Sequence, residues 1–152
     1  MKEIKNSKSE VYLSTYDNSD LLLPVSGEHK DIENVCVAVK FGDTIIKISP
    51  KEICGCDWNK AMEKYRDNLM SPAYWQMVGQ VHYEVTQALM MINQNLLSFI
   101  WTDVEVLTPL HNDRHAWYYL GYRGVMSTDS KNAILNVRPT LVFQHGPYEK
   151  CS

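Results

Sequence analysis

The sequence lacks a long hydrophobic run. The stretch Leu21-Leu22-Leu23 stops at Pro24, whereas a helix that crosses a membrane needs about 18 or more consecutive apolar residues. Residues 1–8 are polar and lack the apolar segment of a secretion signal. We therefore expect neither a membrane span nor export through a signal peptide.

Cysteine is scarce, with single residues at Cys36, Cys54, Cys56 and Cys151. Cys54 and Cys56 are too close to form an easy disulfide with each other, and a chain without a secretion signal usually keeps free thiols. A Cys-x-Cys pair can begin a zinc site, but a matching pair of Cys or His is missing nearby. His111 and His115 lie in a polar loop, where their spacing does not converge on a metal. We expect no disulfide framework, no metal and no cofactor.

An excess of positive charge is also missing. The net charge is −3, and the 15 Lys and Arg residues are scattered along the chain rather than grouped. Nucleic-acid binding needs a basic surface that neutralises phosphates. We therefore exclude nucleic acid as the main partner. The sequence also lacks a supported Ser-His-Asp, Cys-His or paired-carboxylate arrangement, so we do not expect an enzyme.

The chain has 152 residues, of which 45% are hydrophobic, which predicts one folded domain. Apolar residues alternate with others from Val35 to Phe41, as in a strand. Gly42-Asp43 forms a turn, and Thr44–Ile48 returns as the second strand of a hairpin. This is the clearest strand pair in the sequence.

Two helices are expected after the hairpin. Asp57 suits a helix N-cap, and it precedes an apolar stripe that ends before Ser71-Pro72, namely Trp58, Ala61, Met62, Tyr65 and Leu69. A second helix is expected from about Val81 to Leu97. Short strands are then expected at residues 99–103, 115–122, 124–127 and 134–143. This order favours an α+β fold with mainly antiparallel strands over a parallel βαβ sheet.

The domain boundaries follow from composition. Residues 1–33 are mostly polar, so we expect them to form an N-terminal arm or irregular lead-in. We expect residues 34–146 to form the folded domain and residues 147–152 to form a tail. The arm contains the apolar pieces Val11-Tyr12-Leu13 and Leu21-Leu22-Leu23. We expect the arm to dock onto another subunit or protein; the alternative is that it folds back over its own hairpin.

Eight short motifs follow one another within residues 35–143. They are, in order, Trp58-Asn59-Lys60-Ala61-Met62, Trp75, Trp101-Thr102, Glu105, Ala116-Trp117-Tyr118, Gly124, Lys131 and Val137-Arg138-Pro139. In this order the sequence resembles the C-terminal domain of the Legionella collagen-like protein and its bacterial and phage relatives. The resemblance implies a C-type-lectin-like fold.

The sequence departs from that family in several places. Trp75-Gln76-Met77-Val78-Gly79 replaces the usual Trp-Arg-Leu-Pro-Thr turn, and Ile100 replaces the Tyr before Trp101. The Glu-Pro-Asn and Trp-Asn-Asp motifs of calcium-dependent sugar-binding lectins are also absent. Because Ca²⁺ takes about six to eight oxygen ligands, we expect no calcium-dependent sugar site.

The aromatic residues and the closing strand have structural interpretations. Four tryptophans at motif positions are expected in the core, with a carbohydrate-stacking platform as the alternative. Arg138 lies in an apolar strand, so its guanidinium must be paired if it is buried. We expect a structural ion pair between Arg138 and Glu105 or Asp103; the alternative is an anion-binding arginine.

Two polar loops are the candidate ligand-binding segments, at residues 108–114 and 127–133. In C-type-lectin-like folds these loops lie on the ligand-facing side, and their composition suits adaptable recognition as well as it suits any solvated loop. The candidate ligand-binding residues are His111, Asn112, Asp113, Arg114, Asp129, Ser130 and Asn132.

The resemblance implies a non-catalytic binding or structural module, because relatives of this kind occur as adhesins, tail-fibre tips and virion decorations. A chain without a secretion signal fits a phage virion component, since virions leave the cell by lysis. Its partner would be a protein, another copy of the chain, or a cell-surface glycan or protein. The alternative is a cytoplasmic protein-interaction module, such as a phage-encoded inhibitor of a host factor.

Overall fold

A computed structural model of the chain describes residues 8–26, 33–107 and 114–144. These residues form a mixed α+β structure, as the sequence predicts. The strands are β1 (Ser9–Thr15), β2 (Val35–Phe41), β3 (Thr44–Ile48), β4 (Ile53–Cys56), β5 (Phe99–Glu105), β6 (His115–Leu120), β7 (Val125–Ser130), β8 (Leu135–Val137) and β9 (Thr140–Gln144). The helices are α1 (Trp58–Tyr65), α2 (Pro72–Gln80) and α3 (His82–Met91), and a short 3₁₀ turn follows α1 at Arg66–Asn68.

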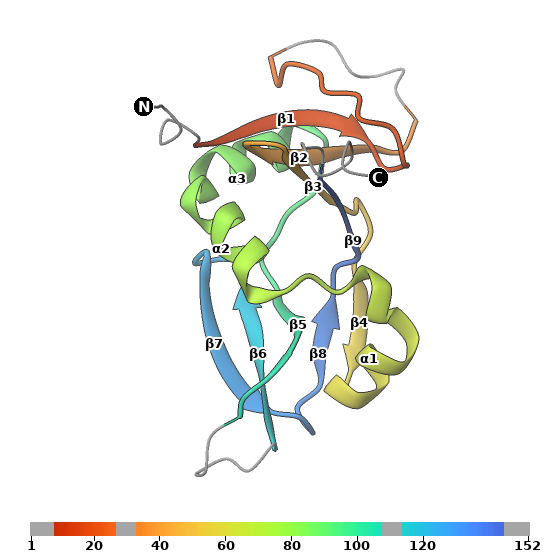
Figure 1. The fold of residues 1–152 in the computed structure, drawn as a ribbon, viewed down its shortest axis with the longest axis vertical. Coiled ribbons are helices and arrows are strands. Elements are labelled where there is room, and N and C mark those ends of the chain that lie inside the picture. The colour runs from red at the N-terminus through yellow and green to blue at the C-terminus, as the bar shows by residue number, and fades with distance from the viewer. Residues whose placement is uncertain (1–7, 27–32, 108–113, 145–152) are drawn as a thin grey trace, which may run out of the picture.

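The strands form two sheets. One has four strands in the order β1-β2-β3-β9, and the other has five in the order β4-β8-β5-β6-β7. Figure 1 shows the first sheet at the top, the second below it, and α2 and α3 packed between them on one side. No helix among the described residues is long and apolar enough to span a membrane.

The predicted hairpin is confirmed. β2 and β3 pair antiparallel from Val37 opposite Ile48 to Phe41 opposite Thr44. Gly42 in the turn has a φ of 59°, a conformation that costs glycine little because it has no Cβ.

The first apolar piece of the predicted N-terminal arm follows the alternative expectation and folds back over its own hairpin. Residues 9–15 form β1, which pairs antiparallel with β2 along its whole length. Leu23 folds back beside this strand and makes an antiparallel bridge with Leu13, with main-chain hydrogen bonds of 2.8 and 2.9 Å. Val11, Leu13 and Leu23 therefore pack on their own sheet, whereas Leu21 is exposed. A boundary at residue 33 would cut through that sheet.

Helix α1 begins where the sequence predicts. The Asp57 carboxylate accepts a hydrogen bond of 2.9 Å from the Lys60 N–H, which satisfies a main-chain donor of the first turn. Trp58 and Ala61 on the apolar stripe are buried, and Leu69, which follows the 3₁₀ turn, is buried in the same cluster.

The sequence predicts two helices, but the described residues form three α-helices, and α2 is the additional one. Pro72 does not end helical structure but starts α2, because a proline at the first helical position lacks only a hydrogen bond that the helix does not need there. Helix α3 then ends at Met91 rather than near Leu97. Asn93 has a φ of 59°, a left-handed conformation that stops a right-handed helix.

The closing segment, residues 134–143, is divided between the two sheets. β8 lies inside the second sheet, antiparallel to β4 and parallel to β5. After Arg138-Pro139 the chain enters the first sheet as β9, antiparallel to β3. Figure 1 shows β8 and β9 in line, one continuing into the other.

Two apolar cores result. The first lies between the four-stranded sheet and helices α2 and α3, and it includes Val37, Ile46, Trp75, Leu89 and Tyr119. The second lies between α1 and the five-stranded sheet, and it includes Trp58, Trp101, Tyr118 and Val137. Because alternate residues of β6 point to opposite faces, Tyr119 joins the first core and Tyr118 the second.

Candidate functional site

Three residues of the sequence motifs meet at one end of the second sheet. The Lys131 ammonium lies 2.6 Å from the Glu105 carboxylate and 4.6 Å from the centre of the Trp58 ring. The Trp58 N–H donates a hydrogen bond of 3.0 Å to the Lys131 carbonyl. An ion pair, a cation–π contact and a main-chain bond thus join α1, β5 and the segment after β7.

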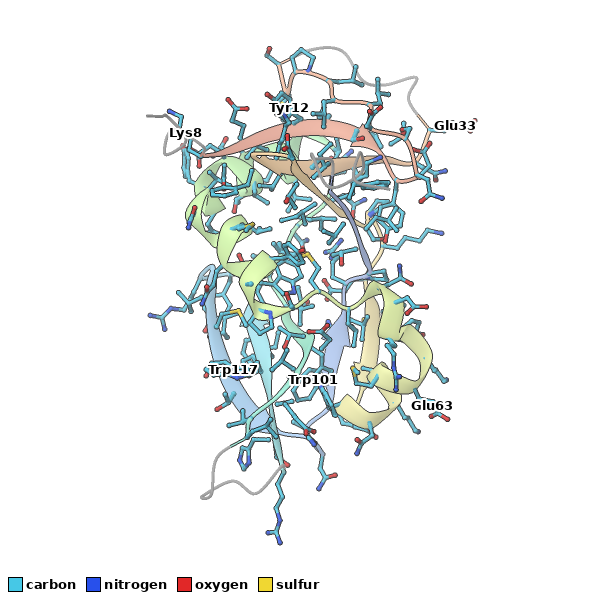
Figure 2. The ribbon with its side chains drawn as sticks, viewed as in Figure 1. Lys8, Tyr12, Glu33, Glu63, Trp101 and Trp117 are labelled. Carbon is cyan, nitrogen blue, oxygen red and sulfur yellow. The ribbon has the colours of Figure 1, made fainter. Side chains whose placement is uncertain are left out.

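The tryptophans confirm the core interpretation for three of the four positions. Trp58, Trp75 and Trp101 are buried. The Trp58 indole donates to the Thr102 carbonyl and the Trp101 indole donates to the Cys56 carbonyl, both at 2.9 Å, so these two buried N–H groups have partners. Trp117 is only half-buried. Trp117 belongs to β6 and Trp101 to β5, and Figure 2 shows the two residues apart from each other.

A polar hollow of about 470 Å³ lies beside the Lys131 cluster. It is lined by Asn59, Arg114, His115, Ser130, Lys131 and Asn132. These side chains come from the start of α1, the start of β6 and the turn that follows β7. The hollow is therefore built where three separate segments of the chain meet.

Main-chain hydrogen bonds hold the walls of this hollow. The Lys131 N–H donates to the Arg114 carbonyl at 2.9 Å, and the Ala133 N–H donates to the Ser130 carbonyl at 2.9 Å. The Ser130 hydroxyl accepts a hydrogen bond of 3.2 Å from the Asn132 N–H. The backbone under the polar side chains is thereby fixed, a condition for a preformed binding site.

Three of the predicted ligand-binding residues line the hollow, namely Arg114, Ser130 and Asn132. His111, Asn112 and Asp113 lie outside the described residues. Asp129 is absent from the lining: it belongs to β7, and its carboxylate accepts a hydrogen bond of 2.7 Å from the Ser130 N–H. The second predicted loop is thus a strand up to Ser130 and a turn only after it.

Asn59, His115 and Lys131 are lining residues that were not among the predicted ligand-binding residues. Lys131 and Trp58 were recognised as motif positions, but sequence spacing did not indicate that they contact each other across 73 residues of chain, from 58 to 131. Asn59 faces the hollow only because α1 begins beside the turn after β7, and this depends on the tertiary structure.

Comparison with known proteins gives no match: no protein-family model, no curated protein and no solved structure is significantly similar to the chain. The geometry of the hollow is therefore the basis for a functional argument.

The charged side chains that line the hollow include Arg114 and Lys131 and no carboxylate. Arg114 is exposed, and the positive charge of Lys131 is offset by Glu105. A second hollow of about 500 Å³ runs along the polar side of α1 and shares Asn59 with the first. Glu63 and Lys64 line it together with Arg66 and Asp67. The second hollow therefore has charged groups of both signs, whereas the first is lined by an arginine and a lysine but by no carboxylate.

The predicted partner of Arg138 is wrong. Arg138 is buried, as expected, but its guanidinium pairs with Glu52 at 2.9 Å. It also donates to the carbonyls of Ser49, at 2.8 Å, and Asn95. Glu105 is occupied by Lys131, and the Asp103 carboxylate is not bonded to the guanidinium. The reason is the chain path: Arg138 lies at the crossing from β8 to β9, beside the β3–β4 connection that carries Ser49 and Glu52.

Metal ligands are not grouped in the described part of the chain, where no three His, Cys, Asp or Glu side chains lie together. Cys54 and Cys56 differ in environment, since Cys54 is exposed and Cys56 is buried. Burial raises the pKa of the Cys56 thiol. The Cys-x-Cys pair therefore does not present two thiols to one ligand position.

Proposed function

We propose that this protein is a non-catalytic binding module with a C-type-lectin-like fold, and that it recognises its ligand through the hollow lined by Arg114, Lys131 and Asn132. The observation that carries the proposal is the hollow itself, with polar side chains on a backbone fixed by hydrogen bonds. Three of the seven residues expected from the two candidate loops line it: Arg114 directly precedes β6, Ser130 ends β7, and Asn132 lies in the turn that follows.

The contacts among the motif residues support the fold assignment within this proposal. Trp58, Glu105 and Lys131 are far apart in sequence yet interact directly. Three of the eight motif positions thus form one interacting cluster, as expected if they belong to the shared framework of a family. A framework of this kind positions a binding surface without taking part in chemistry.

The polar lining of the hollow supports a binding role with a polar ligand. Amide, hydroxyl, ammonium and guanidinium groups line it, and they match a protein surface or a glycan through hydrogen bonds. In line with the resemblance, we propose that the module belongs to a phage virion, as a decoration or a tail- or fibre-associated protein.

Site-directed substitution tests the binding role. The purified chain is screened for binding to a panel of immobilised bacterial-surface glycans and proteins, alongside the double variant Arg114→Ala, Asn132→Ala. Lys51→Ala serves as a matched control, because Lys51 is also exposed but lies outside the hollow. We expect at least a tenfold loss of affinity in the double variant and none in the control.

Two results would contradict the proposal. One is binding that the double variant retains in full, which would show that the ligand is recognised outside the hollow. The other is absence of the chain from virions.

Mass spectrometry of purified particles tests the virion role, and we expect it to detect the chain at a stoichiometric level. Its presence in infected cells but not in particles would favour the cytoplasmic interaction protein instead.

A further inference from the structure

The edges of the two sheets differ in how they are protected. An open edge strand presents unpaired N–H and C=O groups that can pair with another chain, so proteins usually blunt such edges. The outer side of β1 is covered at its centre by the Leu13–Leu23 bridge. β4 is irregular between Ile53 and Cys56 and contains Gly55 at a φ of 71°. These two edges are therefore unsuited to pairing.

The edge strand β7 has no such protection within the described part of the chain. Its six residues pair with β6 in unbroken register, from Val125 opposite Leu120 to Ser130 opposite His115. No described strand lies on its other side. A regular strand of this length is a ready template for an added strand.

An apolar row leads to this open edge. Phe99, Leu120 and Val125 lie side by side across β5, β6 and β7. Phe99 is 40% and Val125 44% exposed. The row therefore ends at the open edge with an apolar side chain that has a neighbour on one side only.

Aromatic rings add apolar surface to the same face of the sheet. The Phe99 ring stacks with two tyrosine rings. Its centre lies 5.5 Å from the centre of the Tyr118 ring and 6.0 Å from the centre of the Tyr122 ring. Tyr122 is 50% exposed. Phe99 and Tyr122 are large apolar surfaces left in solvent by the described residues, and such surfaces commonly mark contacts.

One charge on β7 specifies what the added strand should carry. Because side chains alternate along a strand, Val125, Ser127 and Asp129 share the face of the apolar row. Asp129 forms no ion pair within the described residues. An antiparallel strand beside β7 would place an apolar residue opposite Val125 and, four positions earlier in its own sequence, a basic residue opposite Asp129.

We propose that β7 is a docking site for an extended segment of a partner protein, which adds to the five-stranded sheet with an apolar residue beside Val125 and a basic residue beside Asp129. This surface is distinct from the polar hollow, whose lining includes Ser130 but neither of these two residues.

A second copy of the chain does not fit this edge. An antiparallel β7–β7 pairing that uses most of the strand and keeps both apolar rows on one side is centred on Ser127 or on Thr128. Centred on Ser127, it places Asp129 of each copy opposite Val125 of the other, so a carboxylate meets an apolar side chain twice. Centred on Thr128, it places Asp129 opposite Ser127 and Val125 opposite Lys131, so neither an apolar pair nor an ion pair forms at these positions. The occupant is therefore a different sequence.

A synthetic peptide of sequence Thr-Arg-Thr-Val-Thr-Ile-Thr is the probe, with a control peptide in which Glu replaces Arg. Binding to the full chain is followed by NMR chemical-shift changes on titration. We expect the Arg peptide to shift the amides of β7 and to bind on the order of fivefold more tightly than the Glu peptide, the ratio expected for an exposed ion pair.

Three variants locate the interaction. Asp129→Lys should reverse the preference in favour of the Glu peptide, which a merely unfolded variant cannot do. Val125→Lys should weaken both peptides, and Thr128→Lys, on the opposite face of the same strand, should leave the preference unchanged. The proposal is overturned by shifts that avoid β7, by equal affinity for the two peptides, by a Thr128→Lys variant that behaves like Asp129→Lys, or by a dimer that forms through β7.

Discussion

The ammonium group of Lys47 lies 3.5 Å from the Asp17 carboxylate, but main-chain oxygens bind it more closely. It donates hydrogen bonds of 2.6 to 2.9 Å to the carbonyls of Thr15, Asp17 and Ser19. The Lys47 side chain is fully buried, whereas the Asp17 side chain is 58% exposed. Because a buried ammonium needs partners for its donors, Lys47 binds the turn after β1 to the middle of the first sheet.

Substitution of Lys47 should therefore loosen this turn. We expect Lys47→Met to lower the free energy of unfolding by about 2 kcal/mol, because hydrogen bonds to a charged group are lost while the apolar volume is kept. Lys40→Met is the matched control: Lys40 lies on the neighbouring strand, is half-buried and makes no ion pair with a described residue. Urea unfolding measures both, and an equal change in the two variants would refute the role of Lys47.

The ion pair of Arg138 can be tested against the pair that the sequence predicted. Glu52→Gln should destabilise the protein by about 3–5 kcal/mol, because it leaves the buried guanidinium without its counter-charge. Glu105→Gln should cost only about 0–1 kcal/mol, since Glu105 is 35% exposed and binds Lys131 instead. Thermal unfolding of the two variants distinguishes the partners. A larger effect at Glu105 than at Glu52 would contradict the structure.

Asp103 should make stability depend on pH. Its Oδ1 atom is buried without a hydrogen-bond partner in the described structure, and burial raises the pKa of this carboxyl. The folded state therefore holds the proton more tightly than the unfolded chain. The stability that this group contributes is present at low pH and is lost as the pH rises through the raised pKa.

Asp103→Asn should accordingly stabilise the protein at pH 7 and change little below about pH 3, where the carboxyl is mostly protonated in both states. Asp67→Asn is a suitable control, because Asp67 is exposed. Melting temperatures measured between about pH 2.5 and about pH 8 test this. A destabilised Asp103→Asn variant at neutral pH would mean that the charged carboxylate has a favourable role.

Alanine substitutions at two glycines should distinguish the stability cost of backbone strain from the cost of overpacking. Gly55 and Gly124 have similar φ angles, 71° and 69°. A Cβ on Gly55 would meet its nearest atom at 3.9 Å, whereas a Cβ on Gly124 would lie 2.7 Å from the His82 ring. Gly55→Ala should cost about 1–2 kcal/mol from the left-handed conformation alone.

Gly124→Ala should cost about 1–3 kcal/mol more than Gly55→Ala, because it also overpacks the contact between α3 and the β6–β7 turn. Chemical denaturation of both variants provides the comparison. Equal losses would show that His82 moves aside at no cost.

The parts of the fold that could be predicted from sequence depend on local patterns. Alternation identified β2 and β3, and a cap residue with an apolar stripe identified α1. The parts that could not be predicted depend on long-range placement. Arg138 was expected to be paired, but the partner on the β3–β4 connection is specified by the chain path. Pro72 is compatible with both the end and the start of a helix, so sequence alone favoured the wrong choice.

The candidate site follows the same division. Polar composition indicated Arg114, Ser130 and Asn132, but it also selected Asp129, which belongs to a strand. Asn59 and Lys131 enter the hollow only because α1 begins beside the turn after β7. Contacts between segments so distant in sequence have no local signature.

The division of the closing segment between the two sheets has a consequence for the order of folding. Residues 135–144 fill the gap between β4 and β5 and also complete the sheet that begins with β1. During translation, both sheets therefore remain incomplete until the same ten residues leave the ribosome. Until then β3 lacks its neighbour β9, and β4 and β5 lack their shared neighbour β8. Neither half of the molecule can finish folding before the other, so one short piece of chain couples them into a single cooperative unit.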